Sequence, residues 1–386
     1  EAGKVVEEDM QTLLREIEEL KKKVANPWHI DAKNVSLTKK LGSGACGEVW
    51  KGSYMGQDVA VKILNAKVTN QITKDFDAEL ALMREFRSPY TVTFFGVCER
   101  PHPCLVMEFC DRGCLYTVLN KHRDLAPLDW SYFLSHAHQI AKGLQALHGW
   151  VPSIVHRDMK SQNILVTQNY QLKIADFGTA RFAVQDKERE CRGTSPTQGK
   201  KKGYRRYDTF TQVRGTYSYM SPEIRFRQPV TVKSDIYAVG IILWEMVYRC
   251  INGVYEDPYA EFPALRTIGE ALYKAVAEKG TRPTIPSSCP PAVAALIRRC
   301  WHSEPKMRPT AVQLIASVES LQKEYNSHEE EWEDAILYHD SDDPDYDSDD
   351  SDDDDSDESS EEGSEEEEES EEESEVESEE DYEDED

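Results

Sequence analysis

Three closely spaced glycines could bring backbone amides within reach of phosphate oxygens. Gly42, Gly44 and Gly47 stand in the order GxGxxGxV, with runs of β-branched residues on either side. Because glycine has no Cβ, the backbone N–H groups of such a loop can approach an anion closely. The flanking runs predict a β-turn-β hairpin, whereas a dinucleotide-binding loop leads from a strand into a helix. The glycine pattern is common, so it indicates phosphate binding only together with other motifs.

A lysine within an apolar strand pattern is the second candidate for anion chemistry. Lys62 ends the run Val59-Ala60-Val61-Lys62, where an ammonium group is costly unless it meets an anion. Glu79 follows seventeen residues later, inside a helical pattern. Glu79 could hold Lys62 toward a nucleotide phosphate. The alternative interpretation of Glu79 is an ordinary surface glutamate.

Three further motifs follow in a definite order. They are His156-Arg157-Asp158-Met159-Lys160-Ser161-Gln162-Asn163, then Asp176-Phe177-Gly178, then Ser221-Pro222-Glu223. Any one of them could arise by chance, but the ordered set could not plausibly do so. Together with the glycine loop and Lys62, the set resembles the signature motifs of the protein kinases. The resemblance covers residues 35–322, about three quarters of the chain.

The resemblance implies an α+β chain with the two-lobed protein-kinase fold. A small β-rich N-lobe is expected at about residues 35–110 and a larger helical C-lobe at about 111–322. The residue patterns agree with this expectation, because β-branched runs dominate the first third of the globular region and longer helical patterns follow.

Residues outside the catalytic motifs narrow the group. Trp28, Cys300-Trp301 and Arg308-Pro309-Thr310 resemble the tyrosine-kinase-like group, which includes the mixed-lineage and Raf-like kinases. Lys160 and Gly215-Thr216 are typical of serine/threonine kinases. The resemblance therefore implies ATP-dependent phosphorylation of protein serine or threonine residues in signalling. The alternative is a kinase-like scaffold or binding module with negligible turnover.

The resemblance also implies catalytic roles, which follow the logic of phosphoryl transfer. Asp158 would orient the substrate hydroxyl and accept its proton, and Lys160 would contact the γ-phosphate of ATP. Lys62 would pair with the α- and β-phosphates and be braced by Glu79. Every catalytic residue of the motifs is present, which argues against an inactive scaffold.

ATP and Mg²⁺ are the implied cofactors. Asn163 and Asp176 would hold Mg²⁺, a hard cation that prefers carboxylate and amide oxygens. Met107 would be the gatekeeper before the hinge, the segment that joins the lobes and faces adenine. The residues implied to bind ATP are Gly42, Ser43, Gly44, Ala45, Cys46, Gly47, Val49, Ala60, Lys62, Met107, Glu108, Phe109, Cys110 and Leu165.

Two structural features are also implied. One is a stacked apolar spine closed at its base by Asp235, with members His156, Phe177, Met83 and Phe94. The other is a buried ion pair between Glu223 and Arg308.

A long activation segment is expected at residues 176–223. Its extra length is a polar, basic stretch at 185–213. In kinases with an Arg-Asp pair such as Arg157-Asp158, the arginine usually binds a phosphate on this segment. Thr209 and Thr211 are the predicted phosphate acceptors, and their phosphorylation would order the segment by pairing with arginine.

The N-terminal residues 1–26 show the apolar spacing of a heptad repeat. The pattern predicts a helix that either packs on its own domain or forms a homodimer through a coiled coil. Residues 27–34 are predicted to be a linker. Because the first residue is glutamate rather than methionine, we expect a piece of a longer protein.

Residues 323–386 are predicted to be a disordered acidic tail. Residues 340–386 hold 32 of the 73 acidic side chains and no lysine or arginine, which accounts for the net charge of −28. Such a segment cannot bury enough apolar surface to offset its ordering entropy. The tail could bind a basic protein, bind the basic stretch of the same chain, or simply keep the chain in solution.

The remaining features exclude several classes of protein. No membrane span and no secretory signal are expected, because no apolar run is long enough and the first residues follow a charged helical pattern. Nucleic acid is an unexpected partner, because the body of the chain is nearly balanced in charge. Nine cysteines without a CxxC pair favour a reducing compartment, so the expected location is intracellular, in the cytoplasm or alternatively the nucleus. Cys98, Cys104, Cys110 and Cys114 are expected to be small buried side chains rather than zinc ligands.

Overall fold

The structure is a computed structural model. It describes residues 27–44, 47–64, 70–98, 103–121, 129–183 and 217–336. The predicted N-terminal helix, Ala45 and Cys46, the basic stretch with Thr209 and Thr211, and the acidic residues from 340 onward lie outside the described residues.

A five-stranded antiparallel sheet forms the first lobe, with strand order β1-β2-β3-β5-β4. The sheet strands are β1 (Val35–Gly44), β2 (Gly47–Tyr54), β3 (Gln57–Leu64), β4 (Phe94–Cys98) and β5 (Cys104–Glu108). Met55 and Gly56 connect β2 to β3 with φ of 52° and 78°. Two left-handed residues form the tight turn that matches the twist of a hairpin.

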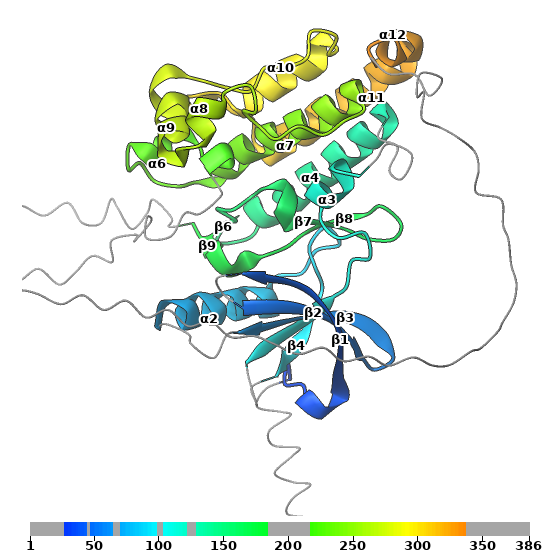
Figure 1. Ribbon diagram of the computed structural model, residues 1–386, viewed down its shortest axis with the longest axis vertical. Helices are drawn as coiled ribbons and strands as arrows, with labels where there is room; N and C mark the ends of the chain where they lie inside the picture. Colours follow the sequence, from blue (N-terminus) through cyan, green and yellow to red (C-terminus); the bar gives the residue numbers. More distant parts are fainter. Residues whose placement is uncertain are drawn as a thin grey trace, which may run out of the picture. The chain divides into compact units, whose positions relative to one another are not determined.

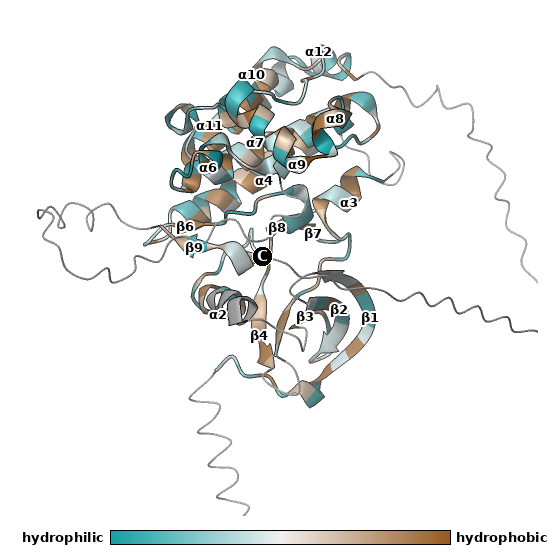
Figure 2. Ribbon diagram, turned by 60° about the vertical axis from the view of Figure 1, so that its left-hand side comes forward, coloured by the Kyte–Doolittle hydropathy of each residue, from teal (hydrophilic) through white to brown (hydrophobic). Residues whose placement is uncertain are grey.

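Helix α2 (Asn70–Glu85) lies beside this sheet in both ribbon views (Figure 1; Figure 2). Its buried residues Phe76, Leu82 and Met83 belong to the same core as Phe94 of β4. Strand β4, whose brown colour in Figure 2 marks apolar residues, thus packs toward the helix that carries Glu79.

The predicted linker at 27–34 is instead part of the first lobe. Ile30 donates its main-chain N–H to the Val97 oxygen at 2.9 Å, and Val97 donates to the Trp28 oxygen at 2.8 Å. The side chain of Ile30 is buried. This segment pairs along the outer side of β4 and so covers an edge strand that would otherwise expose unpaired backbone groups.

The second lobe is mainly helical and is grouped around α7 (Figure 1). Its helices are α3 (Leu115–Leu119), α4 (Trp130–His148), α6 (Pro222–Arg225), α7 (Val232–Asn252), α8 (Pro263–Arg266), α9 (Gly269–Lys274), α10 (Pro291–Cys300), α11 (Ala311–Ser327) and α12 (Glu329–Glu333). Its strands are β6 (Ile154–Val155), β7 (Ile164–Val166), β8 (Leu172–Ile174) and β9 (Arg181–Phe182), paired as β6–β9 and β7–β8.

Local capping residues set the two ends of helix α7, and its apolar composition places it in the core. Thr231 and Ser234 form a capping box at its start, and Gly253 ends it with φ of 70°. Most of its side chains are buried. The helices of the described residues nevertheless include none with the length and apolar composition required to cross a membrane.

The predicted end of the folded domain at residue 322 is wrong. Helix α11 continues to Ser327, and α12 follows it. Trp332 is only 3% exposed and packs edge-on against Trp130 of α4, with ring centroids 5.2 Å apart. The Trp130 indole also donates a hydrogen bond to the Trp332 main-chain oxygen. The packed part of the chain therefore extends to about residue 336. Burial of the Trp332 side chain against Trp130 holds this segment on the domain despite its acidic neighbours.

Candidate active site

Lys62, Glu79 and Asp176 meet between the two lobes. The Lys62 ammonium lies 3.0 and 2.9 Å from the two carboxylate oxygens of Glu79 and 3.0 Å from Asp176 Oδ1. Glu79 is 3% exposed, so it is not an ordinary surface glutamate. The predicted brace of Lys62 is therefore present. Asp176, which is 114 residues away from Lys62 in the chain, is brought to the same ammonium by the fold.

Charge compensation fixes the ionisation of this cluster. Burial alone would lower the pKa of Lys62, but the carboxylates of Glu79 and Asp176 raise it above its usual value. Burial would likewise raise the pKa of Asp176, but the Lys62 ammonium holds it below its usual value. Lys62 therefore stays cationic and Asp176 anionic at neutral pH. These are the charges that a phosphate and a divalent cation require.

The catalytic loop between β6 and β7 places three predicted residues together. Asp158 Oδ2 accepts hydrogen bonds from Lys160 Nζ at 2.7 Å and from Asn163 Nδ2 at 3.0 Å. Asn163 Nδ2 also donates to the main-chain oxygen of Asp158 at 2.8 Å. Because these bonds use the Asn163 side-chain nitrogen, the side-chain oxygen would be the atom that could hold a metal ion. Lys160 neutralises the carboxylate that is expected to receive a proton.

The Asp235 carboxylate of α7 anchors the backbone of the catalytic loop, at the base of the predicted apolar spine. Its carboxylate accepts from the main-chain N–H groups of His156 at 3.0 Å and Arg157 at 2.9 Å, and lies 2.9 Å from His148 Nε2. Arg157 has a left-handed φ of 71°, a conformation that costs energy in a non-glycine residue and is secured by these bonds. The His156 and Phe177 rings lie 5.3 Å apart, as predicted.

The ion pair predicted between Glu223 and Arg308 is also present. Two hydrogen bonds of 2.8 and 2.7 Å join the guanidinium to the carboxylate, and both side chains are almost fully buried. Ser234 donates to the same carboxylate at 2.8 Å. Burial opposes ionisation of Glu223, but its bonds to Arg308 keep its pKa below the usual value. The pair anchors the segment that follows the long activation loop.

Besides Asp235, a second buried carboxylate lies beneath the catalytic loop, and no motif of the sequence predicted it. Glu245 of α7 is fully buried, and its Oε1 accepts hydrogen bonds from three hydroxyls. These are Ser161 at 2.8 Å, Tyr219 at 2.9 Å and Tyr255 at 2.8 Å. Burial raises the pKa of Glu245 to about 7. A glutamate inside the most apolar stretch of the sequence was the available signal.

The glycine loop forms the predicted hairpin between β1 and β2. A Cβ on Gly47, whose φ is +153°, would lie 2.0 Å from the Ile63 carbonyl oxygen of β3. A Cβ on Gly42 would meet no atom within 4 Å. Gly47 is therefore required by the close approach of the strands, whereas Gly42 leaves open space. Gly44 lies at the end of β1, and Ser43 pairs with Glu48 across the hairpin.

The other residues predicted to bind ATP lie on neighbouring strands. Val49 pairs with Lys62, and Ala60 pairs with Met107 across β3 and β5. Leu165 lies on β7 in the second lobe and bridges to Cys114. The predicted nucleotide-binding residues thus lie on strands of both lobes, and Val49 is the direct strand neighbour of Lys62.

The hinge begins at the end of β5, where Glu108 ties three segments together. Its carboxylate accepts from the Thr93 N–H at 3.0 Å and the Thr93 hydroxyl at 2.8 Å, and lies 3.3 Å from Lys173 Nζ of β8. The next residues, Phe109 and Cys110, continue the hinge. Cys110 is 5% exposed, and burial raises the pKa of its thiol to about 12.

The donor set fits a magnesium–nucleotide complex rather than a metal site built from protein alone. Within the part of the chain that the structure describes, no group of three or more His, Cys, Asp and Glu side chains could hold a metal ion. Mg²⁺ is commonly held by one or two carboxylates with phosphates and water completing its shell. Asp176 and Asn163 supply oxygen ligands of this kind, and the Asp176 side chain is 48% exposed.

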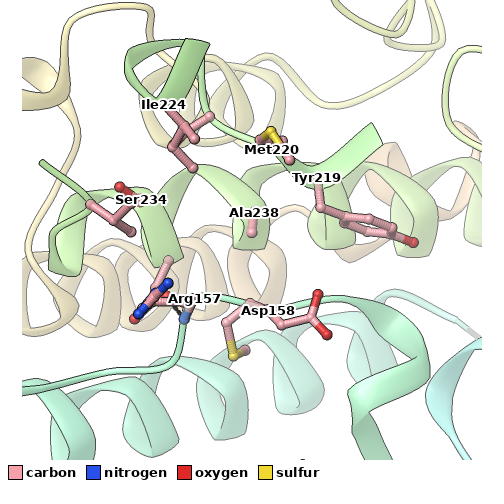
Figure 3. A pocket seen from close by; sticks show the side chains of 11 residues that line it. Arg157, Asp158, Tyr219, Met220, Ile224, Ser234 and Ala238 are labelled. Atoms are coloured by element: carbon pink, nitrogen blue, oxygen red, sulfur yellow. Dashed lines mark hydrogen bonds between the residues drawn. The ribbon is translucent and has the colours of Figure 1, made fainter. Parts of the chain in front are cut away.

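A small pocket of about 50 Å³ lies beside the catalytic aspartate. Arg157 and Asp158 line one side of it, and Met220 and Ile224 lie opposite (Figure 3). The pocket thus joins the catalytic loop to the residues that follow the activation segment. The predicted acceptors Thr209 and Thr211 lie outside the described residues, so the role of Arg157 toward them stays a prediction.

Several known kinases are similar to this chain over most of its length. A probable serine/threonine-protein kinase of Dictyostelium discoideum is 35% identical over 336 residues, which cover 86% of this chain and 36% of that protein. Stress-activated protein kinase alpha of the same organism is 34% identical and covers 80% of this chain and 45% of its own length. Serine/threonine-protein kinase STY17 of Arabidopsis thaliana is 32% identical, with 78% and 47% covered.

The chain spans less than half the length of each of these relatives. The family match is nevertheless extensive, since residues 35–318 match the protein tyrosine and serine/threonine kinases. These matches confirm the predicted α+β kinase fold and agree with the tyrosine-kinase-like group. By its motifs, its fold and these matches, the chain belongs to the protein tyrosine and serine/threonine kinase family.

Proposed function

We propose that this chain transfers the γ-phosphoryl group of ATP to serine or threonine hydroxyls of protein substrates in signalling. The observation that carries the proposal is the completed ion-pair cluster of Lys62, Glu79 and Asp176 beside the hydrogen-bonded Asp158, Lys160 and Asn163. The names of the relatives, which are serine/threonine kinases, support the choice of hydroxyl.

Each residue has a task that its geometry supports. Lys62 binds phosphate oxygens through an ammonium that Glu79 keeps charged and fixed. Asp158 Oδ2 is occupied by Lys160 and Asn163, so Oδ1 is available to accept the proton of the substrate hydroxyl. Asp176 and Asn163 would hold Mg²⁺, which when bound neutralises phosphate charge and supports in-line transfer. The chain therefore contributes positioning and electrostatic stabilisation rather than covalent chemistry.

The testing experiment compares the chain with an Asp158→Asn variant, using labelled ATP and Mg²⁺. Asparagine keeps the size of the side chain but cannot accept the proton, so transfer should fall by at least about 100-fold. Phosphoamino-acid analysis should find label on serine or threonine. Equal transfer by the parent and the variant would overturn the assigned role of Asp158.

The scaffold alternative predicts a different result. A scaffold would bind nucleotide without transfer, even after its activation segment had been phosphorylated by an added upstream kinase. Transfer that appears only after this pretreatment would support the enzyme. Absence of transfer after verified phosphorylation of the segment would favour the scaffold.

A further inference from the structure

Two cysteines lie opposite each other at the turn end of the β4–β5 hairpin. Cys98 is the last residue of β4, Cys104 is the first residue of β5, and the antiparallel register pairs them directly. Opposite residues on antiparallel strands have Cα atoms about 4.5 or 5.5 Å apart and side chains on the same face. Both separations fall within the range of about 4.4–6.8 Å that a disulfide spans.

The two thiols interact in a small apolar cluster of the first lobe. Their neighbours there are Ile30, Val59, Val61 and Val106. Cys98 and Cys104 are 1% and 7% exposed. A hydrogen bond between the thiols raises the pKa of Cys98 and lowers the pKa of Cys104. Cys104 is therefore the sulfur that more readily becomes a nucleophilic thiolate, with a second thiol already beside it.

The other buried cysteines of the described residues differ from this pair. Burial is the leading influence on Cys110, Cys250, Cys289 and Cys300, and it raises the pKa of each thiol. A raised pKa suppresses the thiolate and so suppresses oxidation. The sequence expectation of a small buried side chain therefore holds for Cys110 and is incomplete for Cys98 and Cys104. It is wrong for Cys114, whose side chain is only partly buried.

We propose that Cys98 and Cys104 are a redox modification site that closes to a reversible disulfide in the presence of a peroxide. The Cys104 thiolate attacks a peroxide oxygen, which gives a sulfenic acid and releases water when the oxidant is hydrogen peroxide. The Cys98 sulfur then attacks the Cys104 sulfur and expels a second water. Two thiols are oxidised to one disulfide, and one peroxide is reduced to two waters. A thiol reductant reverses the reaction.

The position of the pair makes the cross-link relevant to the active site. Strand β4 is the last of the five strands and, among the described residues, only the 27–34 segment pairs beyond it, so its turn end can open without disrupting the centre of the sheet. Strand β5 runs from Cys104 to Met107 and Glu108 at the hinge. Oxidation would therefore cross-link the hinge-bearing strand to its neighbour at the end remote from the nucleotide.

The test treats the full reduced chain with hydrogen peroxide, alkylates the remaining thiols and maps the cysteines by mass spectrometry. We expect Cys98 and Cys104 to be joined and lighter by two hydrogen atoms, to escape alkylation together, and to be restored by a reductant. Separate alkylation of both residues, or oxidation of Cys104 to a sulfinic acid with Cys98 still free, would overturn the proposal. This measurement on the unmodified sequence does not depend on any variant folding.

Single cysteine-to-alanine variants identify the two residues that form the cross-link. Cys98→Ala and Cys104→Ala should each abolish the oxidised species, whereas Cys300→Ala, which removes a buried thiol outside the cluster that holds Cys98 and Cys104, should leave its yield unchanged. A disulfide that persists in another pairing in the Cys98→Ala variant at the parental yield would contradict the proposed partner. None of these readouts involves phosphoryl transfer, so they are independent of the proposed enzymatic function.

Discussion

Two groups of carboxylates serve the same site but are stabilised in different ways. Glu79 and Asp176 share the ammonium of Lys62, whose charge offsets the burial of Glu79 and stabilises the ionised form of Asp176. Glu245 lies beneath the catalytic loop and is bonded only by hydroxyls among the described residues. The Lys62 ammonium holds the pKa of Asp176 below its usual value, whereas burial raises the pKa of Glu245 to about 7. Charge compensation thus makes the phosphate-binding group insensitive to pH, while its support can titrate.

Replacing Lys62, the cation that Glu79 and Asp176 share, should have the largest effect on activity and stability. In Lys62→Met, phosphate loses its ammonium and the buried Glu79 loses its partner. We expect phosphoryl transfer to fall by about 100- to 1,000-fold, and the free energy of unfolding to fall by about 3 kcal/mol. Steady-state kinetics and denaturant unfolding measure the two effects. Retained stability in Lys62→Met would show that Glu79 does not depend on Lys62.

The pH dependence of stability should be the second largest effect. Both states protonate Glu245 below its ordinary pKa of 4.5, whereas above pH 7 the folded state must bury a carboxylate. The free energy of unfolding of the parent, relative to Glu245→Gln, should therefore decrease by about 3 kcal/mol as pH rises from 4.5 to 7. Denaturant unfolding at several pH values measures this difference.

Asp176→Asn is a control for Glu245→Gln, because the folded state lowers the pKa of Asp176 but raises that of Glu245. Because the folded pKa of Asp176 is lowered, its contribution to stability is present above its ordinary value of 3.8 and is lost as pH falls below it. The two variants should therefore diverge from the parent in opposite directions and in different pH ranges. If the difference in free energy of unfolding between the parent and Glu245→Gln did not change with pH, Glu245 would not be a buried carboxylate without a charged partner.

Phosphorylation of the activation segment should alter activity to a smaller extent. The double variant Thr209→Ala with Thr211→Ala removes the phosphate acceptors predicted for Arg157. Transfer should fall by about tenfold, the size of one charge-assisted hydrogen bond. Kinetics after treatment with an upstream kinase measure the change. Undiminished activity of the double variant would contradict the prediction. Tyr207→Phe removes a weaker candidate acceptor of the same segment and should reduce transfer less.

Removing one hydroxyl from Glu245 should have the smallest effect. Tyr255→Phe deletes one of three donors to Oε1, and we expect a loss of about 1 kcal/mol in the free energy of unfolding. The pKa of Glu245 should rise further, because a bond that favours its charged form is gone. The midpoint of the pH profile measures the shift. An unchanged midpoint would mean that the remaining two hydroxyls suffice.

Prediction succeeded where a motif lies within one segment, and also where the family resemblance supplied a distant pair such as Glu223 and Arg308. It failed for contacts between distant segments that no motif marks. The glycine hairpin, Lys62 in β3 and the loop from His156 to Asn163 were all identified correctly. The role of Glu245 was missed, because its donors come from two short 3-10 helices, at Ser161 and at Tyr219, and from Tyr255 in the segment that follows α7. The domain end was placed too early because Trp332 was judged with its acidic neighbours rather than with Trp130 of α4.

The sequence by itself determined which chemical groups are present and in what order. Motif order identified the family, and local periodicity predicted the strands and helices, because both depend on neighbouring residues. Tertiary structure alone decided which groups share a site and which ionisation state each one holds. Lys62 meets Asp176 across 114 residues, and Cys98 faces Cys104 through strand register. Burial and opposing charge arise only when distant segments pack, so they set the pKa values that the sequence does not reveal.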